Sequence, residues 1–132
     1  MKYLLDTDTC IYVLKQRAPV LQRMLSRSRA DVAVSVITEA ELRTGAAKSS
    51  APVKTLRLVE NFLRPLTLVE FNSSDAASYA NVRAKLERAG TPIGPFDTLI
   101  AAQAMGRKLI LVSNNEREFR RVRGLRLENW AR

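Results

Sequence analysis

Short apolar runs alternate along the chain with longer segments whose apolar residues recur every three or four positions. The short runs are rich in Val, Leu and Ile and are bounded by polar residues, as buried β-strands are. The longer segments are typical of amphipathic helices. The pattern predicts strands at Lys2–Asp6, Asp31–Ser35, Leu66–Phe71 and Leu109–Ser113, with a short one near Leu125–Leu127. It predicts helices at Thr9–Gln16, Pro19–Ser28, Thr38–Ala47, Pro52–Leu63, Ser74–Ala89 and Asp97–Met105.

The alternation of strands and helices predicts the fold class. Strands that are separated by helices pair in parallel, and the helices pack on both faces of the sheet. We therefore expect an α/β protein, a three-layer α/β/α sandwich with a central and mostly parallel sheet. The 132 residues contain no internal repeat and no linker-like tract, so a single domain over residues 1–132 is expected.

Compartment and redox chemistry follow from simpler features. No apolar stretch approaches the roughly 18 residues that a membrane span requires. The segment Met1–Asp6 is too short, and becomes acidic too early, for a signal peptide, so a cytoplasmic protein is expected. The single Cys10 cannot form an internal disulfide, and the chain has no histidine to activate it, so a buried apolar role is favoured.

Three carboxylates that are far apart in the sequence fall where a strand or loop leads into a helix. Asp6 closes the first strand, Glu41 lies early in the helix after the second strand, and Asp97 opens a later helix. Ligands of parallel α/β sheets bind at the carboxyl ends of the strands, so these side chains are expected to meet there. Carboxylates without histidine suit a hard cation, Mg²⁺ or Mn²⁺, which can activate water against a phosphodiester. The sequence therefore predicts a divalent-metal site.

Each acid also has a local structural interpretation, which the sequence leaves open. Asp6 is placed to cap the helix that follows it. Thr38 and Glu41 have the spacing of a capping box, in which Glu41 only binds a backbone N–H, and Glu39 is a second candidate for the acid at the edge. Asp97 lies where a negative charge interacts favourably with the helix dipole.

The segment that follows the fourth predicted strand is also polar. It offers a hydroxyl, two amides and two carboxyl groups between Ser113 and Glu118. Such groups can support or extend a set of metal ligands, so Ser113 and Asn115 are candidates for contact with the site. The alternative is an ordinary polar loop with a helix cap.

The chain is strongly basic, with 22 Lys and Arg against 13 Asp and Glu and a net charge of +9. This balance favours polyanionic partners, nucleic acid first, because cations neutralise phosphates and release counterions. A dense run of arginines follows the fourth strand, and Arg matches phosphate geometry in a bidentate way that Lys does not. The candidate RNA-binding residues in this run are Arg117, Arg120 and Arg121.

The candidate acids and the polar segment after the fourth strand fall in four segments: Leu4–Cys10, Ser35–Gly45, Pro92–Ala101 and Leu111–Phe119. In their order and spacing these segments closely resemble PIN-domain ribonucleases, and more narrowly the VapC toxins of bacterial type II toxin–antitoxin modules. The resemblance extends to Gly124–Trp130. It implies a PIN-like fold and an endoribonuclease that depends on Mg²⁺ or Mn²⁺ and cleaves structured RNA, with tRNA favoured, to inhibit translation and growth. It also implies a homodimer, inhibition by a cognate VapB antitoxin, and contact with operator DNA only through that antitoxin.

The resemblance also assigns residues. The catalytic acids and metal ligands that it implies are Asp6, Glu41 and Asp97, with Glu41 preferred over Glu39. Many relatives have a fourth Asp where this chain has Asn115, which puts a second metal ion in doubt. Glu118 is the nearby acid that can replace it in part, so the residues expected around the ligands are Ser113, Asn115 and Glu118.

Two rival interpretations differ from this one. The segment Leu4–Thr9 also resembles the Asp-x-Asp motif of haloacid-dehalogenase-type phosphatases, but Asn114 and Asn115 stand where that family needs a terminal acid pair. The second rival is a non-catalytic, basic nucleic-acid-binding domain, which the missing fourth acid would suit. Metal-dependent RNA cleavage that is lost in Asp6→Ala separates a nuclease from both.

Overall fold

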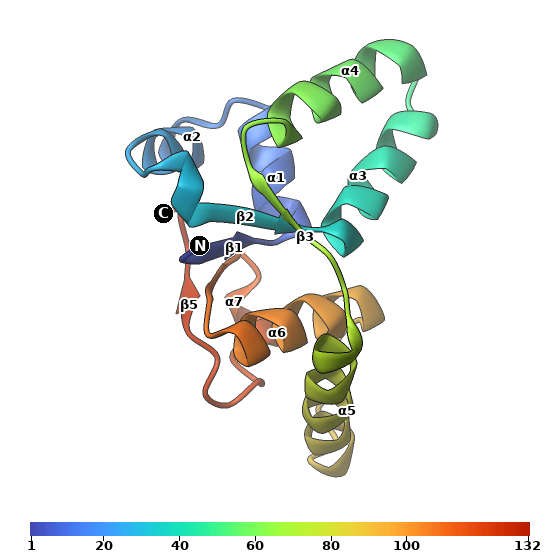
Figure 1. Ribbon diagram of the computed structural model, residues 1–132, viewed down its shortest axis with the longest axis vertical. Coiled ribbons are helices and arrows are strands. Elements are labelled where there is room, and N and C mark those ends of the chain that lie inside the picture. Colours follow the sequence, from blue (N-terminus) through green and yellow to red (C-terminus); the bar gives the residue numbers. More distant parts are fainter.

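Five parallel strands form one sheet at the centre of the protein (Figure 1). The computed structural model describes residues 1–132 and gives the strand order β3-β2-β1-β4-β5. The strands are β1 (Tyr3–Leu5), β2 (Val32–Ser35), β3 (Thr67–Val69), β4 (Ile110–Val112) and β5 (Leu127–Glu128). The helices are α1 (Thr7–Leu14), α2 (Ala18–Leu25), α3 (Val36–Ala47), α4 (Pro52–Leu63), α5 (Ser73–Arg88), α6 (Pro95–Arg107) and α7 (Glu116–Phe119), and a 3-10 turn spans Arg29–Asp31.

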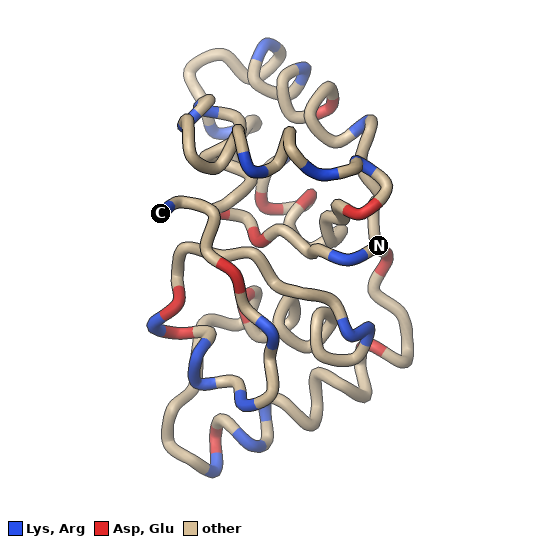
Figure 2. Tube along the Cα trace, turned by 90° about the vertical axis from the view of Figure 1, so that its left-hand side faces the viewer, with Lys and Arg blue, Asp and Glu red and all other residues tan.

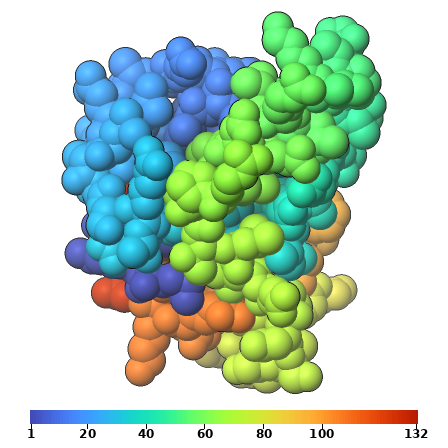
Figure 3. Space-filling model, turned by 45° about the horizontal axis from the view of Figure 1, so that its top comes forward, coloured from blue at the N-terminus to red at the C-terminus, as the bar shows by residue number.

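Two hydrophobic cores lie on opposite faces of this sheet. Successive residues of a strand point to opposite faces, so Tyr3 and Leu5 enter one core while Leu4 enters the other. Helices α1 to α4 cover the first face and α5 to α7 cover the second (Figure 1). On the first face, residues of α2 and α4 line a common hollow, and the two helices are neighbours in the space-filling view (Figure 3). The expected three-layer α/β/α sandwich is confirmed. None of its helices has the length and apolar character that crossing a membrane demands.

The carboxyl ends of the central strands define the edge that carries the candidate site. β1 pairs with both β2 and β4, and Leu5 lies opposite Val34 and Val112. Asp6 and Ser113 directly follow β1 and β4, so they emerge side by side at the same edge. Helix α3 begins there as well, immediately after β2.

Helix α3 begins two residues before its predicted start. The Oγ of Ser35 accepts a hydrogen bond of 3.0 Å from the backbone N–H of Ile37 and so caps the helix at an earlier position. Thr38 therefore lies inside α3 and is fully buried. The interpretation of Thr38 and Glu41 as a capping box is wrong.

Other differences also concern element ends. Helix α6 begins at Pro95, two residues before its predicted start. Proline suits the first turn of a helix, because the backbone N–H that it lacks would have no partner within the helix there. Asp97 is therefore the third residue of α6 rather than its first, and it lies within the first turn. The single turn α7 is too short and too polar to leave a helical pattern in the sequence, and it was not predicted. The last strand, Leu127–Glu128, lies slightly later than expected.

Candidate active site

Asp6 directly follows β1 and caps α1. Its Oδ1 accepts a hydrogen bond of 2.8 Å from the backbone N–H of Thr9, so the capping role is confirmed. The residue is only 3% exposed, and no Lys or Arg forms an ion pair with it. Burial raises the pKa of Asp6 from 3.8 to about 6, although a hydrogen bond with Ser113 acts in the opposite direction. A buried carboxyl group without a cationic neighbour favours a proton or a bound cation.

Glu41 is tied to the start of α1 by a short chain of hydrogen bonds. Its Oε1 lies 2.6 Å from Oγ1 of Thr7, the residue after Asp6. Oγ1 of Thr7 in turn lies 3.2 Å from Oγ1 of the buried Thr38. A hydroxyl has one hydrogen and a carboxylate only accepts, so Thr38 donates to Thr7 and Thr7 donates to Glu41. The sequence pattern does not predict this role of Thr7; the one available signal is the position of Thr7 next to Asp6.

The second candidate acid on α3 has a different environment. Glu39 Oε2 accepts a hydrogen bond of 2.9 Å from Nε of Arg43, and the two residues form an i,i+4 ion pair on the helix surface. Glu41 has no ion-pair partner. The structure therefore brings Glu41, and not Glu39, to the site edge.

Asp97 is half-buried in the first turn of α6, where negative charge surrounds it. Burial, followed by the charges of Asp6, Glu118 and Glu41, raises the pKa of Asp97 from 3.8 to about 7. Because such repulsion weakens with distance, the four carboxyl groups occupy one region of the protein. No Lys or Arg forms an ion pair with any of the four.

The loop after β4 supports two of these acids. Ser113 is fully buried and lies close enough to Asp6 to lower the pKa of its carboxyl group, and the Oγ of Ser113 accepts a hydrogen bond of 2.9 Å from the backbone N–H of Asn115. The Nδ2 of Asn115 donates a hydrogen bond of 2.6 Å to Oε2 of Glu118, which lies on α7. Ser113 thus lies beside Asp6, and Asn115 contacts Glu118.

The chemistry of this donor set suits a hard divalent cation. Every candidate ligand is a carboxylate oxygen, and none is neutralised by Lys or Arg. A cation would also remove the repulsion that raises the pKa of Asp97. The side chains as placed do not form a ready ligand shell, since no three acidic or thiol groups lie close enough to enclose an ion. Four side chains nevertheless have the charge and the burial that suit such an ion, namely Asp6, Asp97, Glu41 and Glu118.

Comparison with known proteins identifies the family. The sequence model of the PIN domain matches residues 3–125. The chain is 44% identical to ribonuclease VapC2 of Haemophilus influenzae and 39% identical to the tRNA(fMet)-specific endonuclease VapC of Salmonella typhimurium, with 99% of both chains covered in each case. This chain belongs to the PIN-domain family, in its VapC branch. Its fold also matches the DNA-bound VapBC complex of Salmonella typhimurium, with a TM-score of 0.91, 40% identity and 98% of each chain covered.

Membership of the PIN family decides two points that the sequence left open. The resemblance carried by the four segments is confirmed, and the phosphatase interpretation of Leu4–Thr9 is wrong.

Cys10 is fully buried in this PIN domain, and burial raises the pKa of its thiol well above the ordinary value, so it packs as an apolar residue.

The arginines considered for RNA contact lie on or just after α7 of this PIN domain. Arg117, Arg120 and Arg121 are all exposed. Arg120 pairs with Glu116 at 3.0 Å, whereas Arg117 and Arg121 have no acidic partner. Figure 2 shows Lys and Arg positions over both helical layers, so the positive charge is not confined to this segment.

Proposed function

We propose that this PIN domain is an endoribonuclease toxin that cleaves structured RNA, with tRNA as the favoured substrate, and thereby inhibits translation and growth. The main support is the group formed by Asp6, Glu41, Asp97 and Glu118, which lies at one sheet edge without a cationic partner. Buried like charges destabilise a fold, so such a group suits a protein whose acids bind a cation. The ribonuclease names of its VapC relatives support RNA as the substrate.

The proposed cofactor is Mg²⁺ or Mn²⁺. Asp6 and Asp97 would hold it directly, and Glu41 and Glu118 would complete the set directly or through water. When bound, the ion supplies a water molecule of lowered pKa and offsets charge on the phosphate.

The chain's own residues position the reactants. Thr7 holds Glu41, whose carboxylate orients the attacking water, while the backbone N–H of Thr9 fixes the carboxyl group of Asp6. Water attacks phosphorus in line, the bond from phosphorus to the 3′ oxygen breaks, and the products carry a 5′-phosphate and a 3′-hydroxyl. Arg117 and Arg121 would neutralise neighbouring phosphates of the RNA.

A VapB antitoxin is the proposed inhibitor of this enzyme, and a homodimer is its proposed active form. The solved relative from Salmonella typhimurium is a VapBC complex bound to DNA, which supports an antitoxin partner. An antitoxin arginine placed among the four acids would replace the cation by charge alone. Operator DNA would then be contacted through the antitoxin, in a cytoplasmic complex.

Cleavage of total RNA by the purified protein tests this function. The wild type should produce discrete fragments with Mg²⁺ or Mn²⁺ and none with EDTA, and Asp97→Asn should produce none while it remains folded. Asp31→Asn is the matched control, because Asp31 lies before β2 at the opposite end of the sheet. Cleavage by Asp97→Asn at the wild-type rate would contradict the site. Intact RNA under every condition, with binding retained, would favour the non-catalytic interpretation.

A further inference from the structure

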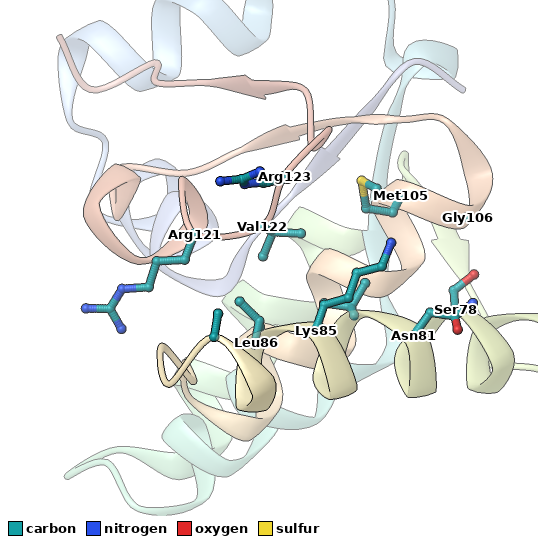
Figure 4. Close-up of a pocket in the computed structure, with 11 residues that line it drawn as sticks. Ser78, Asn81, Lys85, Leu86, Met105, Gly106, Arg121, Val122 and Arg123 are labelled. Atoms are coloured by element: carbon teal, nitrogen blue, oxygen red, sulfur yellow. The ribbon is translucent and has the colours of Figure 1, made fainter.

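A basic groove runs along the second helical layer. It lies between α5, the end of α6 and the segment after α7, and it has a volume of about 580 Å³ (Figure 4). Its apolar floor is formed by Val82, Leu86, Met105 and Val122. Its polar lining consists of Ser78, Asn81, Lys85, Arg121 and Arg123, and none of its lining residues is acidic. In Figure 4, Lys85 rises from α5 and Arg123 lies across the hollow from it.

The three cations of this groove carry uncompensated charge. Lys85, Arg121 and Arg123 are exposed, and none forms an ion pair. Other basic residues of the same layer are neutralised, as Arg83 is by Glu87 at 3.0 Å. A hollow that is lined by free cations and contains no acid is complementary to a polyanion.

We propose that this groove, the Lys85 groove, binds the sugar–phosphate backbone of the RNA substrate beyond the cleavage site. The inference rests on the proposed nuclease function. The four acids at the sheet edge repel phosphate groups, so affinity for RNA has to come from another surface. Lys85 and Arg123 would contact phosphates, the neutral donors Ser78 and Asn81 would reach phosphate or ribose oxygens, and the apolar floor would face the sugars.

The groove is connected to the candidate active site through Arg121. This residue follows α7, which carries Glu118, and its guanidinium donates a hydrogen bond of 2.9 Å to the carbonyl oxygen of Pro92. Pro92 belongs to the loop that leads to α6 and Asp97. An RNA strand that leaves the acids along this loop would therefore enter the groove at Arg121.

Steady-state cleavage by two matched double variants tests the proposal. The groove variant combines Lys85→Gln with Arg123→Gln and so removes two cations of the groove. The control variant combines Lys54→Gln with Arg57→Gln and removes two exposed cations of α4, on the opposite layer, that also lack ion pairs. The probes are a full-length bacterial initiator tRNA and a short single-stranded RNA that cannot span both the acids and the groove. Melting temperatures confirm that both variants are folded.

The groove variant should raise the KM for tRNA roughly tenfold with kcat unchanged, and should leave cleavage of the short RNA unaffected. The slope of log Kd for tRNA against the logarithm of the salt concentration, measured in EDTA, should be smaller by about two in the groove variant. Each lost phosphate contact lowers that slope by about one. The control variant should behave as the wild type.

Three results would overturn the inference. Equal losses in both double variants would show general electrostatic attraction. Unchanged tRNA affinity in the groove variant would exclude the groove and leave the nuclease intact. Weakened binding of an antitoxin with unchanged tRNA affinity would assign the groove to a protein partner. A wild type that neither binds nor cuts RNA would instead refute the proposed function, on which the groove depends.

Discussion

Asp6→Asn should stabilise the metal-free protein near neutral pH. Asp6 is 3% exposed, and burial raises its pKa from 3.8 to about 6. Each pKa unit corresponds to about 1.4 kcal/mol, so keeping this carboxylate ionised in the fold costs about 3 kcal/mol above pH 6. Asparagine removes the charge with nearly the same shape, and its Oδ1 can still accept the N–H of Thr9 and cap α1.

The pH dependence of this effect has a definite sign. Because the pKa of Asp6 is higher in the folded protein, the folded state binds more protons than the unfolded state between about pH 4 and pH 6. The free energy of unfolding of the wild type therefore falls as pH rises through this window. The amide of the Asp6→Asn variant does not titrate, so the advantage of that variant should be small near pH 4 and should approach about 3 kcal/mol by pH 7.

Urea unfolding in EDTA, repeated across this pH range, measures the difference. Asp6→Ala is the informative second variant, because it removes the charge and also the helix cap, and it should gain about 1 kcal/mol less than Asp6→Asn. Mg²⁺ should stabilise the wild type more than either variant. If the wild type and Asp6→Asn showed the same dependence of unfolding free energy on pH, the carboxyl group would not be desolvated as described.

Two further substitutions examine how the acids are held. Thr7→Val removes the hydroxyl that donates to Glu41 and should lower kcat about 10- to 100-fold with KM little changed. Thr7→Ser keeps a hydroxyl and should retain the wild-type activity. Thr44→Val, on the exposed side of α3, is the control and should have no effect. Equal activity of Thr7→Val and the wild type would remove Thr7 from this role. Glu118→Gln should lower the pKa of Asp97, which NMR of the carboxyl carbon measures. It should also weaken the binding of Mg²⁺, which calorimetry measures. An unchanged pKa would show that the two carboxyl groups do not interact.

The order of elements was predictable because each one buries a periodic set of apolar residues. Leu4 and its neighbours form a continuous apolar run, as a central parallel strand does, and most helices show one apolar face. Element ends depend on single side chains instead. The sequence pattern assigns Ser35 to the end of a strand, whereas it caps α3, and it places Pro95 in a loop, whereas it is the first residue of α6. The turn α7 has too few residues for any period to be visible.

The sequence predicts the position of a site residue well where that residue directly follows a strand. Asp6 follows a strand, so its place at the sheet edge follows from the fold class. The position of Glu41 required knowledge of where α3 begins, which the capping-box interpretation placed too late. Thr7 and the Lys85 groove depend on contacts between segments that are distant in sequence, and no local pattern encodes such contacts.

The amide at position 115 lies beside a carboxyl group that places negative charge near Asp97. Family resemblance leads one to expect an acid here, and its replacement by Asn115 suggests a site with one negative charge fewer. The structure shows that Asn115 donates a hydrogen bond of 2.6 Å to Glu118, three residues further along, and the charge of Glu118 raises the pKa of Asp97. Residues three apart share one side of a helical turn, so α7 places this acid next to the position that Asn115 occupies. Part of the negative charge near Asp97 is therefore supplied by Glu118 of α7, whose carboxylate the amide of Asn115 contacts. Glu118→Gln removes that part, while the charges of Asp6 and Glu41 remain.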